Sequence, residues 1–397
     1  MADSERVLTA RFLLVVSAGL AYFMALGAVL PIVPRYVKHE LGGGSLQVGI
    51  AVGVLFVGAV ALRPYAGRLG DRFGRRVLIV SGALVVSVSI LAYGAIHSLE
   101  WLIFARIVTG LGEAAFFVGA ATMVADLAPV ARRGEAISYW SVAVYGGMAF
   151  GPALGVVVRD AGGVDTVWWV AGGLGLLAAA LGACTREVPH PQGEQVDRRI
   201  LNRAAVGPGM ILFSGLIALS AFVAFVPLYV DDIGSSADVV FLLYGGLVLA
   251  VRVIGARLPD RLGGRTAALM ALASTTAGMG IMASWRSTAG LLTGTVVFGL
   301  GMSLLYPALL LLALGAAPET ERASVVGTFS SFFDLSQGLG ALMVGGVAAA
   351  TDYRGAFGAG AVAAAIGAVA LRTHTVQRQR AAALEEAGAL AAEHSAT

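Results

Sequence analysis

Long apolar runs recur along this chain from one end to the other, and they determine whether it folds in water or in a membrane. The first runs from Phe12 to Val33, and each run of about 20 residues is long enough to cross ~30 Å of hydrocarbon as a helix. Apolar residues make up 58% of the chain and charged residues 13%, with a mean hydropathy of +0.83. Soluble domains carry roughly 25% charged residues. We therefore predict an all-α membrane protein.

The apolar runs predict twelve membrane-spanning helices. Their expected positions are residues 12–34, 47–65, 77–96, 101–124, 136–158, 165–184, 208–230, 238–256, 267–285, 289–314, 324–349 and 355–371. The first run is too long for a signal-peptide core, so we expect it to remain as the first span. Residues 1–185 and 208–371 form two units, joined by the mixed-charge stretch 186–207 and followed by the polar tail 372–397.

An internal repeat relates the two units. The link Gly-Arg-Leu-Gly-Asp-Arg-Phe-Gly-Arg-Arg at 67–76 returns 189 positions later as Ala-Arg-Leu-Pro-Asp-Arg-Leu-Gly-Gly-Arg at 256–265. The same offset places Arg63 on Arg252 and Gly112 on Gly301. Near the start of each half the offset is 193, because a short insertion lies near 42–45. Six helices per half is an even number, so we predict two six-helix bundles with the same orientation, related by a pseudo-two-fold axis along the membrane normal.

Basic residues predict the orientation in the membrane. The side that holds both termini and the stretch 186–203 collects 21 of the 27 lysines and arginines. By the positive-inside rule this side, with both termini, is cytoplasmic. We expect a multi-pass protein of a bacterial-type plasma membrane. The sequence pI of 9.2 reflects these loops, so no nucleic-acid partner is expected.

Other chemistry finds little support in the sequence. Cys184 is the only cysteine, which excludes an internal disulfide and a thiolate metal cluster. The five histidines lie in loops or tails without ligand spacing. We expect no metal and no cofactor.

The motifs resemble those of the major facilitator superfamily. The signature of that family between the second and third helices is matched by Gly67, Gly70, Asp71, Arg72, Gly74, Arg75 and Arg76. The second, less complete copy at 256–265 keeps Asp260 and Arg261. Arg106 with Gly110 and Gly112 resembles a second motif of that family. The antiporter motif of its proton-coupled drug exporters is similar to Gly147, Gly151, Pro152 and Gly155, although Val156 stands where a glycine is usual. The resemblance implies a central cavity lined mainly by helices 1, 4, 7 and 10 and opened alternately to either side.

Each motif has a physical interpretation. Asp71 could accept backbone N–H groups at a helix start or pair with an arginine, and these contacts would change as the bundles rock. We therefore interpret the link at 67–76 as a conformational gate loop, and the alternative is a loop that only orients the protein. Gly147, Gly151 and Gly155 recur every four residues and give a smooth surface for close helix packing, with or without a role in coupling.

Charges inside the spans mark candidate proton sites. Arg106 and Glu113 lie seven residues apart on one helix face, and Glu113 is ~18 Å along that helix from Trp101, near the bilayer midplane. A carboxyl group there could bind and release a proton, and its repeat mate is Met302. A permanently neutral or paired structural role is the alternative. Asp334 is the other deep acid, either a second proton or substrate site or a hydrogen-bonding anchor between helices.

Bulky side chains on the expected cavity helices suit a small, partly apolar substrate. These candidates are Tyr22, Phe116, Phe117, Phe222, Phe225, Met302 and Tyr306. Contacts with lipid are the alternative role for many of them.

The resemblance predicts a transporter rather than an enzyme, driven by the proton gradient and acting as a monomer. We expect it to export small amphipathic or lipophilic molecules in exchange for protons. Export of sugars or metallophores and proton symport for uptake are alternatives within the class. A membrane sensor without transport is an alternative from another class.

Overall fold

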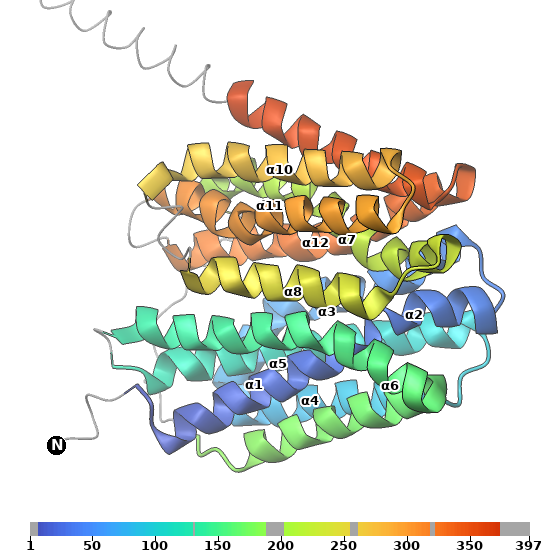
Figure 1. The fold of residues 1–397 in the computed structure, drawn as a ribbon. Helices are drawn as coiled ribbons and strands as arrows, with labels where there is room; N and C mark the ends of the chain where they lie inside the picture. The colour runs from blue at the N-terminus through green and yellow to red at the C-terminus, as the bar shows by residue number, and fades with distance from the viewer. Residues whose placement is uncertain (1–6, 130–131, 188–201, 255–260, 318–321, 374–397) are drawn as a thin grey trace, which may run out of the picture.

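A computed structural model describes residues 7–129, 132–187, 202–254, 261–317 and 322–373, and in these ranges every regular element is a helix. Figure 1 shows the helices running roughly side by side, with the blue-to-green first half against the yellow-to-red second half. Within these described ranges, ten helical segments are long and apolar enough to cross a membrane. The prediction of an all-α membrane protein is confirmed.

The first half begins with a span in three parts: α1 (Ala10–Val29), α2 (Ile32–Arg35) and a π-helical turn (Tyr36–Glu40). The helices that follow are α3 (Ser45–Phe73), α4 (Arg75–Tyr93), α5 (Leu99–Leu127) and α6 (Arg133–Ala183). Two predicted spans lie within α6. Gly163, with φ 82°, breaks the helix between them, a backbone conformation that glycine adopts without strain.

The second half consists of α7 (Arg203–Ile233), α8 (Ala237–Ile254), α10 (Gly264–Ser284), α11 (Thr288–Gly315), α12 (Arg322–Ala350) and a last helix, Tyr353–Thr373. The apolar run at 208–230 predicted that α7 starts at residue 208. In the structure α7 begins earlier, where the Asn202 side chain accepts a hydrogen bond from the Ala204 N–H at 3.0 Å. The end of the predicted linker is therefore helical.

The most extensive contacts between the halves are those of α3 with α12 and of α6 with α8. Glycines make both contacts close. A Cβ added to Gly53 would lie 2.4 Å from the Gly338 carbonyl oxygen, and one added to Gly245 would lie 2.4 Å from the Ala149 Cα. The repeat relates α3 to α8 and α6 to α12, so the two interfaces are equivalent. We call the end of the bundle with the α3–α4 link the basic side, and the end with the link 41–44 the opposite side.

Candidate coupling site between the bundles

Arg63 on α3 is the centre of a charged cluster that joins the two halves. Its Nη2 lies 3.0 Å from the Glu113 Oε2 on α5, and its Nη1 lies 2.8 Å from the Asp334 Oδ2 on α12. The first contact stays within the first bundle and the second crosses to the other. One guanidinium therefore holds a carboxylate from each bundle.

The cluster is withdrawn from solvent and carries more acid than base. The side chains of Arg63, Glu113 and Asp334 are 16%, 11% and 3% exposed. Two carboxylates facing one guanidinium leave one negative charge in excess when both are ionised.

Aromatic side chains surround this cluster. The Arg63 guanidinium carbon lies 5.1 Å from the centre of the Phe117 ring. Tyr306, the repeat mate of Phe117, lies close enough to Arg63 and Asp334 to interact with them electrostatically, and its hydroxyl is 3.2 Å from the Ser330 Oγ. Tyr22 is buried near Glu113 and stacks on Phe116 with ring centres 3.7 Å apart. Four predicted cavity residues thus lie at or next to the charged cluster.

Phe222, Phe225 and Met302, the other predicted cavity residues, pack inside the second bundle. Phe222 stacks on Phe298 with ring centres 5.0 Å apart, and Phe225 stacks on Tyr353 at 5.6 Å. Met302 is buried. In this conformation these three side chains form part of the core of their bundle.

Arg106 does not pair with Glu113, although both lie on α5. Its Nε donates to the Ala51 carbonyl oxygen at 2.9 Å, and its Nη2 donates to that of Val52 at 3.3 Å. These contacts fasten α5 to α3. The arginine that faces Glu113 is instead Arg63, which the sequence marked only as a member of the repeat.

A glutamate beyond the signature completes the predicted gate loop. The Glu187 carboxylate accepts hydrogen bonds from the backbone N–H groups of Arg75 and Arg76, at 2.8 and 3.0 Å, at the start of α4. Gly74 adopts φ 96°, and a Cβ there would lie 2.7 Å from Glu187 Oε2. Glu187 therefore occupies the helix-capping position proposed for Asp71.

The other gate residues have different places. Arg75 pairs with Asp126 at 3.3 Å and donates to the Gly70 carbonyl oxygen, so Asp126 is tied to the gate loop. Arg72 is exposed beside Phe73, Gly67 has open space around it and Arg261 is exposed. The Asp71 side chain and Asp260 lie outside the described part of the structure.

The glycine stripe on α6 packs directly on α1. A Cβ added to Gly147, Gly151 or Gly155 would lie 2.6 Å from the Phe23 Cβ, 2.7 Å from the Gly27 Cα and 2.0 Å from the Ala28 carbonyl oxygen, respectively. The Pro152 Cδ also faces Gly27. The predicted close packing is confirmed. These residues position the first span against the fifth.

The opposite side carries a second ion pair between the bundles. The Arg35 guanidinium, on α2, contacts both carboxylate oxygens of Asp231 on α7, at 2.5 and 3.1 Å. The arginine is buried and holds the partly exposed carboxylate in a two-point contact. The two halves are therefore tied together at this end.

The comparisons with known proteins agree with this architecture. Residues 15–290 and 257–394 match the family described as Major Facilitator Superfamily. The chain belongs to the major facilitator superfamily. Among its relatives is an uncharacterized MFS-type transporter of Burkholderia mallei strain SAVP1, 30% identical over 96% of both chains. Another, from Salmonella typhimurium strain LT2, is 29% identical over 90% of this chain and 94% of that protein.

Solved structures of the superfamily share the fold. A bacterial homologue of the human lysosomal transporter Spinster, inward-facing and occupied, aligns with a TM-score of 0.78 at 17% identity, over 92% of this chain and 96% of that one. The nucleoside transporter NupG aligns with a TM-score of 0.74 at 14% identity, over 92% of this chain and 99% of that one. The fold of this MFS chain is thus that of a secondary transporter.

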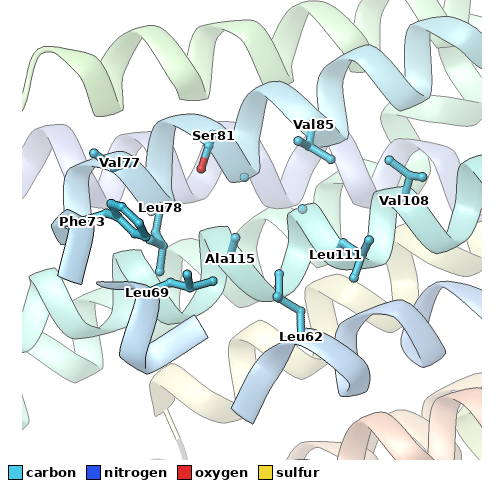
Figure 2. Close-up of a pocket in the computed structure, with 12 residues that line it drawn as sticks. Leu62, Leu69, Phe73, Val77, Leu78, Ser81, Val85, Val108, Leu111 and Ala115 are labelled. Atoms are coloured by element: carbon cyan, nitrogen blue, oxygen red, sulfur yellow. The ribbon is translucent and has the colours of Figure 1, made fainter. Parts of the chain in front are cut away.

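A groove on the first bundle has a different character from the charged cluster. Its volume is about 390 Å³, and it lies among α3, α4 and α5, with Leu69, Phe73 and Val77 at one end (Figure 2). Ser81 is its single polar lining side chain in Figure 2. The groove of this MFS protein is therefore an apolar surface feature that is separate from the charged cluster.

Proposed function

We propose that this MFS protein is a proton-coupled transporter and that the Arg63–Glu113–Asp334 cluster is its proton site. The observation that carries this proposal is one guanidinium holding two buried carboxylates from different bundles. Protonation of Asp334 would remove the ion pair that crosses between α3 and α12, while Arg63 keeps its contact with Glu113. Protonation would thereby weaken the contact between the bundles.

We further propose the direction of exchange. The α6 stripe resembles the motif of drug/proton antiporters, and it packs the fifth span on the first. With the basic side in the cytoplasm, the protein would export small amphipathic molecules while protons move inward. A membrane potential of ~100 mV contributes about 2.3 kcal/mol per charge moved.

The test is proton movement in liposomes that hold the purified protein and an internal pH dye. Addition of transported molecules from a panel of lipophilic cations, sugars, metallophores and organic anions should release protons with wild-type protein. We expect Glu113→Gln and Asp334→Asn each to reduce this release at least tenfold. The matched control is Asp160→Asn, which removes an exposed carboxylate that pairs with Arg159.

Two results would overturn parts of the proposal. Unchanged proton movement in both variants would exclude the cluster as the proton site. Protons that move in the same direction as the substrate would replace antiport by symport while leaving the proton site in place.

A further inference from the structure

The repeat mate of the central arginine lacks both acidic partners. Arg252 on α8 corresponds to Arg63, and the positions of Glu113 and Asp334 correspond to Met302 and Tyr145. Arg252 forms no hydrogen bond or ion pair with any described residue, and its Nε is buried without a partner. The same position in the repeat thus holds an arginine that faces two carboxylates in one bundle, and an arginine without those acidic partners in the other.

The contact that Arg252 does make leaves its donors free. Its guanidinium carbon lies 3.4 Å from the centre of the Tyr145 ring, on α6 of the other bundle. A guanidinium on a ring face is held by the aromatic surface, while its N–H groups point outward in its own plane. This edge can bind a carboxylate or phosphate through two parallel hydrogen bonds.

The depth of this contact argues against a surface role. Tyr145 lies ~18 Å along α6 from the helix start at Arg133, close to the middle of a bilayer ~30 Å thick. A charged side chain at that depth costs about 2.5–3.5 kcal/mol even on the mildest scale, so such residues serve a pathway or a ligand. The π contact with Tyr145 does not use the N–H donors of Arg252.

Tyrosines connect this position to the proton site. Tyr306 lies close enough to Tyr145, Arg63 and Asp334 to interact with all three electrostatically. Tyr244 likewise lies close enough to Arg252 and Tyr145 to interact with both electrostatically. These tyrosines place Arg252 in the same region between the bundles as the charged cluster.

We propose that Arg252 binds the anionic group of the transported molecule, so that the substrate is an amphipathic organic anion. This inference rests on the proposed transport function and names its substrate class. The proton site and the anion site then use the two repeat-related arginines, one satisfied by protein carboxylates and the other by the substrate.

Binding of three matched probes tests the assignment: 2-naphthoate, its neutral amide and 2-naphthylmethylammonium. Isothermal titration of the purified full-length protein should show the carboxylate binding at least tenfold more tightly than the amide, as expected for a charge-assisted two-point contact. In Arg252→Gln this preference should disappear. Arg252→Lys, which keeps the charge without the planar fork, should retain only part of it. Arg203→Gln, which removes an exposed arginine at the start of α7, should retain all of it.

Three outcomes would overturn the proposal: equal binding of carboxylate and amide, no binding of the carboxylate by wild-type protein, or a full preference in Arg252→Gln. If Arg252→Gln does not fold, a full preference for the carboxylate in Arg252→Lys would likewise overturn the proposal. The titration needs no proton gradient, so its failure is distinct from failure of the proton site. Glu113→Gln should keep the carboxylate preference even where it abolishes proton movement.

Discussion

At the scale of single residues, the arrangement around Arg63 makes one side chain responsible for two contacts. Its planar guanidinium presents separate nitrogens to Glu113 and Asp334, which a lysine ammonium cannot reproduce with the same geometry. The charge balance of the site depends on this residue, because both acids are buried. Loss of the arginine would leave two carboxylates close together without a cation.

Arg63→Gln should therefore destabilise the protein strongly, by about 3–5 kcal/mol, because breaking a buried pair leaves uncompensated charge. The measurement is the thermal midpoint of purified protein by differential scanning fluorimetry. The triple variant Arg63→Gln, Glu113→Gln and Asp334→Asn should recover much of the loss, since no buried charge remains. A triple variant as unstable as Arg63→Gln alone would show that packing by the arginine stem, rather than charge, explains the effect.

At the scale of helices, close backbone contacts decide which elements move together. Gly151 packs on Gly27 of α1, and its repeat mate Gly340 packs on Ser220 of α7. The fifth and eleventh spans are thus each joined to the first span of their own bundle. Meanwhile Gly53 and Gly245 bring α3 and α8 against the other bundle.

Gly155→Ala should separate α6 from α1, because the new Cβ would lie 2.0 Å from the Ala28 carbonyl oxygen. We expect a loss of about 1–3 kcal/mol, typical of overpacking, together with slower transport. The matched control on the same helix is Gly146→Ala, whose Cβ would meet only the Leu20 Cδ1 at 3.6 Å. Thermal midpoints and transport rates of the two variants check this difference. Equal effects would mean that the stripe does not set the helix spacing.

At the scale of the whole molecule, the two halves are tied at one end by Arg35 and Asp231 and near the middle by Arg63 and Asp334. On the basic side, Gly67 and Gly327 have open space around them. Closure at the opposite side is therefore held by an ion pair that must separate when that side opens. The partly exposed Asp231 limits the strength of this pair.

Arg35→Gln should shift the population toward molecules open at the opposite side. Cys184 is the sole cysteine, so a Cys184→Ser background allows spin labels at Lys38→Cys and Asp232→Cys, one on each bundle. Double electron–electron resonance should show a larger long-distance fraction in Arg35→Gln than in the background alone. The exchanged pair Arg35→Asp with Asp231→Arg should restore the short distance. An unchanged distribution in Arg35→Gln would exclude the pair as a latch.

The sequence alone determined the membrane environment, the helix positions, the two-fold repeat and the superfamily. Apolar runs of membrane length and a fixed 189-residue offset are local or periodic signals, and they persist without any knowledge of packing. Glu113, Asp334 and the glycine stripe also stood out, because acids and spaced glycines are conspicuous within apolar helices.

Only the tertiary structure decided which charges meet. Arg63 and Asp334 are far apart in the chain, and Arg63 lies near a basic loop. No sequence pattern therefore favours Arg63 over Arg106 as the partner of Glu113. Glu187 likewise belongs to a mixed-charge stretch, yet the end of the sixth span brings it to the start of α4. Ion pairs and caps between distant segments depend on helix rotation and on interhelical spacing of a few ångströms, which a hydropathy pattern does not specify.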